Sequence, residues 1–184
     1  MCHYDVTSEH YMKKEETNEN NDGVLSALLE DPTRSLRQIA QKLGSYRQKI
    51  WRKKKQLEQK NIIWGYTAVV DDRAQNHVLY ITLLTMKPIS KDLVDLIINR
   101  VTNQQFKKQQ IRLINVLFVN GQYDWVITFS APDHATARRY YDSLRIAYEP
   151  YLLEKPVIID VNFSLIREGK INPNIHNLKK FIPR

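Results

Sequence analysis

Ten lysine and arginine side chains cluster between Pro32 and Lys60, and their chemistry is that of anion binding. They are Arg34, Arg37, Lys42, Arg47, Lys49, Arg52, Lys53, Lys54, Lys55 and Lys60. The same segment holds one acid, Glu58, so ten minus one leaves +9, whereas the whole chain carries +8. A charge this localised favours a polyanion, because an ordinary solvent-facing surface mixes both signs. Nucleic acid is the first candidate.

Two short helices joined by a glycine turn must position these side chains. Ser35 with Gln38, and Ser45 with Gln48, have the S-x-x-Q spacing of a capping box. In this motif the serine and the glutamine satisfy each other's orphan backbone amides. Gly44 lies between the two boxes, where a left-handed residue is needed. The pattern predicts a helix-turn-helix whose second helix is strongly basic.

The segments on either side complete this unit. Gly23 is expected to open a preceding helix, in which Val24, Leu25, Leu28 and Leu29 recur at helical spacing. Asp31-Pro32 should end that helix, because a residue before proline disfavours the α region. The basic helix is expected to end at Asn61. The β-branched and aromatic segment 62–71 then predicts a strand that leaves the domain.

One side of the basic helix is suited to reading base edges. At about 100° per residue, Ile50 and Leu57 share a side and anchor the helix. Arginine and lysine can bind guanine edges in the major groove, and glutamine can bind adenine. Flanking basic groups suit phosphates. The predicted DNA-binding residues are Arg37, Ser45, Tyr46, Arg47, Gln48, Lys49, Arg52, Lys53, Lys55 and Gln56.

The remainder of the chain has a different rhythm. Its predicted elements are strand 77–86, helix 90–101, strand 111–119, strand 122–130, helix 133–148 and strand 157–166. Asn120-Gly121 is a two-residue hairpin signal between the middle strands, and Asp133 should cap the second helix. This βαββαβ order predicts a ferredoxin-like domain with one antiparallel sheet. The fold class is therefore α+β, with a (winged) helix-turn-helix domain first.

Both faces of that sheet are apolar in sequence. Val78, Tyr80, Leu84 and Met86 alternate with Leu79, Ile81 and Leu83, and Leu113, Leu117 and Val119 alternate with Ile114, Val116 and Phe118. A sheet with one wet face should alternate cleanly with polar residues, which these strands do not do. Two helices cover only one face, so we expect a second copy of the chain to cover the other. A two-fold dimer would set its reading helices about 34 Å apart, or a multiple, on a palindromic site.

Composition limits the other possibilities. With 42% hydrophobic residues the chain can bury a core, and no apolar run approaches the ~18 residues of a membrane span. Cys2 is the only cysteine, which favours a reducing, cytoplasmic setting without disulfides. Cys2, His3 and His10 could meet at a metal, but a polar tail without metal is favoured. No membrane partner and no cofactor are expected.

Several motifs resemble those of the Lrp/AsnC (feast/famine) transcriptional regulators of bacteria and archaea. They are VLSALLEDPTRSLRQIAQKLG, then R-x-x-I-x-R and L-E, the segment NIIWGYTAVVD, and NGQYDWVITFSAPD, within about residues 21–168. The resemblance implies a DNA-binding domain and a domain that dimerises, assembles further to a tetramer or octamer, and binds an amino acid. It carries the effector role onto Gly121, Tyr123 and Asp124. The alternative is structural: Gly121 would serve the turn, Tyr123 would pack on the sheet, and Asp124 would cap or solvate an edge.

Three positions depart from the family pattern. Tyr46 stands where the family usually has serine, so the cap is expected one residue earlier, at Ser45. Lys54 replaces an aliphatic residue, so its stem should snorkel past the core, with Trp51 filling the space. The tail after Gly169 is an addition that the resemblance does not cover.

The resulting domain prediction has five parts: a mobile tail 1–20, the helix-turn-helix domain 21–63, a linking strand and hinge 64–76, a ferredoxin-like dimerisation and effector domain 77–168, and a tail 169–184. The leading function is a sequence-specific DNA-binding transcriptional regulator, not an enzyme, associated with the nucleoid. An architectural DNA-binding protein is the alternative. An enzyme similar to siroheme decarboxylases is a third, which would need a cationic pocket with histidine in the second domain.

Overall fold

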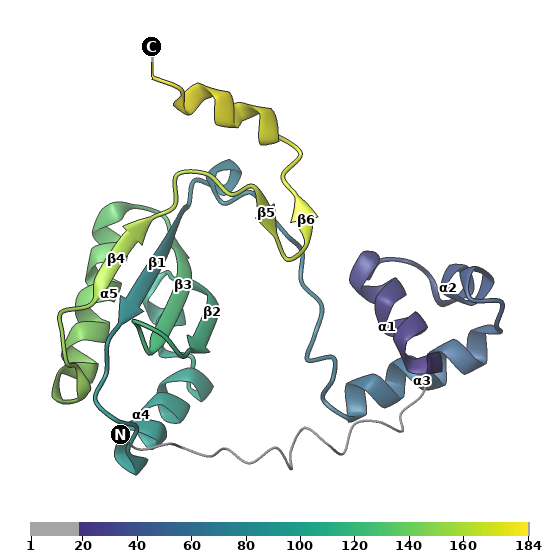
Figure 1. Cartoon of the computed structure of the whole chain (residues 1–184), viewed down its shortest axis with the longest axis horizontal. Coiled ribbons are helices and arrows are strands. Elements are labelled where there is room, and N and C mark those ends of the chain that lie inside the picture. The colour runs from purple at the N-terminus through teal and green to yellow at the C-terminus, as the bar shows by residue number, and fades with distance from the viewer. Residues whose placement is uncertain (1–18, 184) are drawn as a thin grey trace. The chain divides into compact units, whose positions relative to one another are not determined.

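The structure, a computed structural model, describes residues 19–183, which form two compact units (Figure 1). The first unit ends at Ala68 and the second begins at Val69. The metal site considered for Cys2, His3 and His10 lies outside the described residues. Within residues 19–183, no helix is long and apolar enough to cross a membrane. The same range contains no cluster of three potential metal-ligating side chains.

The first unit consists of helices α1 (Glu19–Glu30), α2 (Leu36–Lys42) and α3 (Arg47–Gln59). Its core is formed by Val24, Ala27, Leu28, Ile39, Ala40, Ile50 and Leu57. The Ser35–Gln38 capping box is confirmed, since both reciprocal bonds are present. Gly44 is left-handed (φ 57°), and the amide of Ser45 donates to the carbonyl of Ala40 (2.9 Å). This bond closes a Schellman turn at the end of α2.

Two predictions for this unit are wrong. Helix α1 already includes Glu19 rather than opening at Gly23. Leu29 lies in this helix as predicted, with 71% of its surface exposed. The second capping box does not form: Tyr46 occupies the N-cap position of α3 without a side-chain cap bond. The reason is that Ser45 belongs to the Schellman turn of α2, one residue too early to cap α3.

The connection between the units is irregular where a strand was predicted. Helix α3 ends in a second Schellman turn, in which Asn61 is left-handed (φ 54°) and the amide of Ile62 donates to Leu57 (3.0 Å). Residues 63–70 then belong to no strand. A strand needs a backbone partner, and this segment pairs with none of the residues described here. Trp64 within it is 94% exposed.

The second unit confirms the ferredoxin-like prediction. Its elements are β1 (Val78–Leu84), α4 (Lys91–Thr102), β2 (Arg112–Phe118), β3 (Trp125–Ala131), α5 (His134–Tyr148) and β4 (Val157–Asp160). The antiparallel sheet has the order β2-β3-β1-β4, and Figure 1 shows α5 behind it. Asp133 caps α5 as predicted, because its carboxylate accepts the Thr136 amide at 2.6 Å. Ser90 caps α4 in the same way.

One face of the sheet packs against the helices and the other does not. Tyr80, Leu84, Ile127 and Phe129 are buried beneath α5. The opposite face, which we call the open face, carries Leu79, Ile81, Leu83, Leu117, Val126, Val157 and Ile159, whose register partners lie side by side. For β2, the predicted alternation of residues between the two faces of the sheet was wrong. A bulge between Leu113 and Asn115 shifts the register, so Leu113 packs in the core while Leu117 lies on the open face.

The turns at the sheet ends also differ from the prediction. Asn120 and Gly121 do not form a two-residue turn: the Val119 amide donates to the Asp124 carbonyl (2.8 Å), which leaves a four-residue loop. The last strand ends at Asp160, and a separate hairpin of β5 (Ile166–Arg167) and β6 (Lys170–Ile171) follows. Its two turn residues, Glu168 and Gly169, both have positive φ, as a type I′ turn requires.

A buried ion cluster holds this hairpin in place. Asp72 is only 5% exposed and accepts hydrogen bonds from Arg112 and Arg167. Arg167 also donates to the carbonyl of Val70 (2.9 Å), and Arg112 donates to the hydroxyl of Ser130 (3.2 Å). A buried carboxylate is tolerated when it is paired in this way. The hairpin that follows β4 is thus bound through Arg167 to the segment before β1.

Candidate nucleic-acid interface

Helix α3 is anchored along one side and exposed along the other. Ile50 and Leu57 are each 2% exposed and belong to the core of the first unit. The side opposite them, which we call the basic face, carries Gln48, Lys49, Arg52, Lys55, Gln56 and Gln59. Of these residues only Gln56 is half-buried, and the others are exposed. The prediction that this helix presents amide and cationic groups to solvent is confirmed in geometry.

The other predicted DNA-binding residues border that face. Arg37 on α2 is exposed, as are Tyr46 and Arg47 at the start of α3. Tyr46 is 61% exposed although it occupies the N-cap position. Ser45 and Lys53 are half-buried, and the hydroxyl of Ser45 is turned inward. Nine of the ten predicted side chains therefore keep an orientation compatible with DNA contact, whereas Ser45 does not.

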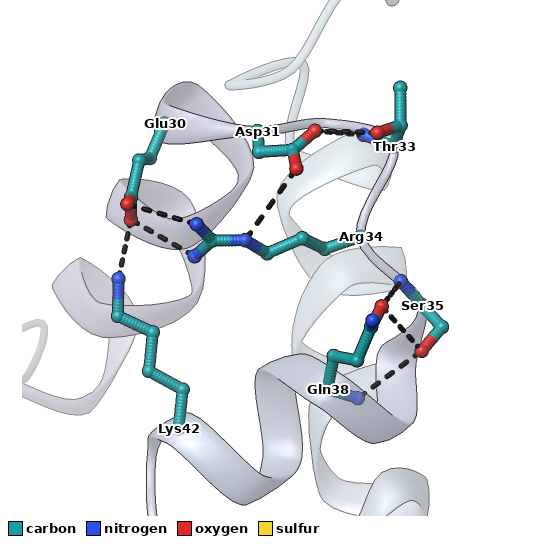
Figure 2. A network of polar contacts seen from close by, with 7 residues as sticks. All are labelled: Glu30, Asp31, Thr33, Arg34, Ser35, Gln38 and Lys42. Atoms are coloured by element: carbon teal, nitrogen blue, oxygen red, sulfur yellow. Dashed lines mark hydrogen bonds and ion pairs between the residues drawn. The ribbon is translucent and has the colours of Figure 1, made fainter.

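A polar network fixes α2 against α1 (Figure 2). The Glu30 carboxylate accepts hydrogen bonds from both terminal nitrogens of Arg34, at 3.0 and 3.1 Å, and from Lys42. Hydrogen bonds from Lys42 and then Arg34 lower the pKa of Glu30 to about 2. Within the loop after α1, the Asp31 carboxylate accepts hydrogen bonds from the amide and the hydroxyl of Thr33. Arg34 and Lys42 thus bind α1 and α2 to each other through Glu30. We call these three residues the frame, because α1 and α2 support the helix that carries the basic face.

The lowered pKa predicts acid sensitivity of this frame. Because the folded-state pKa of Glu30 (about 2) lies below its ordinary value (4.5), its stabilising effect is complete above pH 4.5. That effect is lost as the pH falls from 4.5 towards 2. Thermal unfolding of the full chain, followed by circular dichroism at pH 5 and pH 3, should show a drop in Tm that is smaller in Glu30→Gln. Equal drops in both proteins would contradict this role, and added salt should reduce the effect because the network is exposed.

Lys54 forms a second cluster on the flank of α3. It is ion-paired with Glu58 (3.2 Å), and its ammonium lies 5.0 Å from the ring centre of Tyr66. The hydrogen bond with Glu58 raises the pKa of Lys54. The predicted snorkelling is therefore correct in direction, but Trp51 does not fill the space. Trp51 is 48% exposed, because it lies about 100° around the helix from Ile50.

Sequence reasoning missed Trp51 as a surface residue beside the basic face. The ammonium of Lys55 lies over its ring, 5.0 Å from the centre. This cation–π contact orients a lysine along the helix surface. The angular offset from Ile50 was the signal that could have placed the ring outside the core.

The predicted effector residues lie in and beside the loop between β2 and β3. The Asp124 carboxylate accepts the amide of Met86 (2.7 Å), and the Asp124 amide donates to Leu84 (3.0 Å). These bonds tie the loop to the end of β1 and give Asp124 a structural role. Tyr123 is half-buried and Gly121 is exposed, and both precede β3, which starts at Trp125.

Solved structures of known proteins share this architecture. No family model matches the sequence, and no curated protein matches it. Among solved structures, an AsnC family transcriptional regulator from Agrobacterium tumefaciens aligns with TM-score 0.62 and 15% identity, covering 90% of this chain and 99% of that one. The leucine response regulatory protein LrpA of Mycobacterium tuberculosis aligns with TM-score 0.66 and 13% identity, over 85% and 99%.

A third solved structure was determined with a ligand. It is a transcriptional regulator from Neisseria meningitidis in complex with L-methionine, with TM-score 0.63 and 15% identity, covering 86% of this chain and 97% of that one. At these identities the likeness establishes the fold. The chain thus has the fold of the Lrp/AsnC regulators, over almost the whole length of each of these proteins.

Proposed function

Starting from this shared fold, we propose that the protein is a DNA-binding transcriptional regulator that reads double-stranded DNA with α3. The observation that carries the proposal is the exposed basic face, built on a helix whose other side is buried. A helix in the major groove can bring such side chains to base edges, while flanking cations meet phosphates. Arg37, Arg47 and Lys60 border the face and suit phosphates. The protein acts in the cytoplasm, at the nucleoid.

The open face supports a dimer as the working unit. Ile81 and Leu83 of β1 lie beside Ile159 and Val157 of β4, so that an apolar surface runs across neighbouring strands. Val157 and Ile159 are 40% and 43% exposed in the single chain. Apolar surface of this kind is stabilised by burial against a partner. A two-fold dimer gives two reading helices and therefore a palindromic site, and further assembly to a tetramer or octamer is compatible with it.

Single substitutions on α3 should separate base reading from phosphate binding. Arg52→Ala and Lys49→Ala are expected to relax base preference, at a cost of ~1–3 kcal/mol for the preferred sequence. Lys53→Ala, on the flank, is expected to weaken preferred and unrelated sequences by the same factor. Fluorescence anisotropy with a selected fragment and a scrambled one measures both effects. If Arg52→Ala weakened both fragments equally, Arg52 would be a phosphate contact instead.

Selection of bound fragments from random DNA tests the proposed function and its alternatives together. A regulator should enrich one motif with two-fold symmetry, far above background. An architectural protein would bind the library with at most a slight preference, because phosphate contacts carry no sequence information. The enzyme alternative would enrich nothing. It also requires histidine in a cationic pocket, whereas His77 contacts Ser130 and His134 contacts Tyr80.

An amino-acid effector at Gly121, Tyr123 and Asp124 is a second, separate part of the proposal. The Neisseria regulator bound to L-methionine supports the class of ligand. An effector acts through different affinities for different assembly states. Calorimetry with the standard amino acids should detect binding to the wild type and weaker binding to Asp124→Ala. Equal binding by both proteins would place the site elsewhere, and no binding by the wild type would remove amino-acid sensing from the proposal.

A further inference from the structure

The two helices of the second unit pack unequally on the sheet. Helix α5 buries Thr136, Ala137, Tyr140, Tyr141, Leu144 and Tyr148, whereas α4, which is described along its whole length, buries only Leu93. Further along α4, Ile97 is only partly buried, and Val101 is 43% exposed. Tight packing would bury an entire helix stripe. The carboxyl-terminal half of α4 therefore covers the sheet incompletely.

A cavity of about 40 Å³ lies under this half of α4. Its walls come from Leu84 of β1, from Met86 just beyond the end of that strand, from β2 and β3, and from α5. A single water needs roughly 10–15 Å³ on the same measure. The cavity thus has room for a short chain of heavy atoms. Val116, Trp125 and Ile127 are among its apolar lining, so a hydrocarbon group is the favoured content.

Arg100 is the one charged residue among the described side chains that line this cavity. It is half-buried, and its guanidinium carbon lies 5.5 Å from the ring centre of Tyr148. A guanidinium carries five N–H donors in its own plane, so donors remain for a ligand even though Arg100 also forms a hydrogen bond with Tyr148. These donors suit a carboxylate, which accepts two parallel hydrogen bonds. The cavity therefore combines an apolar interior with a cationic group.

The hydroxyl groups beside Arg100 remain neutral. Burial raises the pKa of Tyr148, and it raises the pKa of Tyr140 even further above its ordinary value. Neither phenol competes with a ligand as an anion. Within residues 19–183, no aspartate or glutamate lines the cavity, so an ammonium group brought into it would lose its water without gaining a counter-charge.

We propose that this cavity binds a small monocarboxylic acid with an apolar tail, with the tail under α4 and the carboxylate on Arg100. The same chemistry disfavours the corresponding amino acid, because its ammonium would find no acid among the described lining residues. The site lies in the core of the second unit, between α4 and the sheet. It is therefore distinct from the loop that carries Gly121, Tyr123 and Asp124. A ligand there would hold α4 against the sheet.

Calorimetry on the full chain with three probes of similar size tests the assignment. The probes are isovalerate, its neutral amide isovaleramide, and L-leucine. Isovalerate is expected to bind the wild type, with isovaleramide and leucine weaker by roughly tenfold or more, since a hydrogen bond to a charged group is being removed or an ammonium buried. The proposal would be overturned if isovalerate at millimolar concentration gave no binding heat with the wild type and did not compete with either of the other probes. Leucine binding as tightly as isovalerate would also overturn it.

Two variants and a matched control locate the site. Arg100→Gln should reduce isovalerate affinity to the level of isovaleramide while leaving isovaleramide binding unchanged, which shows that the variant is folded. Val101→Trp should fill the cavity from its exposed side and weaken both probes by roughly tenfold or more. Arg138→Gln is the control, because Arg138 lies 5.0 Å from the Tyr141 ring on the same unit but outside the cavity. If Arg100→Gln bound isovalerate as the wild type does, the assignment would be wrong. DNA binding is not part of this readout, so the outcome is independent of the proposed function.

Discussion

Replacing Arg37, Arg47 and Lys60 together by glutamine should lower DNA affinity by roughly 10²–10³-fold at 0.1 M salt. All three side chains are exposed and border the basic face of α3. Each neutralised phosphate contributes about 0.9 logarithmic units of affinity per tenfold decrease in salt. At about 1 M salt these contacts contribute little, and each gains about 0.9 logarithmic units of affinity when the salt falls tenfold to 0.1 M. Losing three of them in one helix-turn-helix domain therefore lowers log K at 0.1 M salt by about 2.7. Fluorescence anisotropy with a selected DNA fragment measures the change.

The control removes the same charge from the second unit. Lys91, Arg138 and Arg145 are exposed, and the change Lys91→Gln, Arg138→Gln, Arg145→Gln lowers the net charge from +8 to +5, as the triple substitution at Arg37, Arg47 and Lys60 does. If net charge alone attracted DNA, both triples would lose affinity equally. The proposed interface predicts that the control keeps affinity within a few-fold of the wild type. Equal losses would remove the specific role of α2 and α3.

Placing two glutamates on the open face should convert the proposed dimer to a monomer. Ile81→Glu with Leu83→Glu puts carboxylates at the centre of this face, beside Thr128 and Val126 of β3. An uncompensated buried charge costs several kcal/mol, so the dimer dissociation constant should rise by roughly 10³-fold or more. Light scattering at micromolar concentration should then report a monomer. Affinity for a palindromic site should fall as well, because only one half-site is held at a time.

A matched substitution distinguishes loss of the dimer from loss of the fold. Ile146 on α5 is 70% exposed and lies on the opposite side of the sheet, so Ile146→Glu should leave the assembly unchanged. Circular dichroism of the double variant should retain the wild-type spectrum, since Ile81 and Leu83 are only half-buried in the single chain. A wild-type protein that is monomeric at micromolar concentration would contradict the assignment of the open face.

Several features decided by neighbouring residues were predictable from the sequence, although the Ser45–Gln48 box was not among them. The Ser35–Gln38 box, the cap at Asp133 and the glycine turn at Gly44 all form. Each depends on groups within a few residues, so a short pattern contains the necessary information. The order of strands and helices followed from hydrophobic periodicity in the same way. The basic face was predictable because helix geometry fixes which residues lie opposite Ile50.

Features decided by distant interactions were not predictable. Asn120-Gly121 has a strong local turn signal, yet Asp124 is bound to Leu84 and Met86, at and just beyond the end of β1, which sets the loop length. The last strand ends at Asp160, and the hairpin after it is held by Arg167, which binds Asp72, 95 residues earlier. The bulge in β2 and the incomplete covering by α4 leave no simple trace in hydrophobic alternation. The cavity beside Arg100 could be found only once α4 and the sheet were placed together.

The salt dependence of DNA binding tests the central claim most directly. The basic side chains that we propose to meet DNA, on α2, on α3 and at the end of α3, are Arg37, Arg47, Lys49, Arg52, Lys53, Lys55 and Lys60. If Lys49 and Arg52 read bases and the other five groups meet phosphates, the slope of log K against log salt would be about −4.5 for each copy of the helix-turn-helix domain. The triple substitution of Arg37, Arg47 and Lys60 should make this slope shallower by about 2.7. An affinity that does not change with salt, or a slope identical in the wild type and the triple variant, would contradict the account.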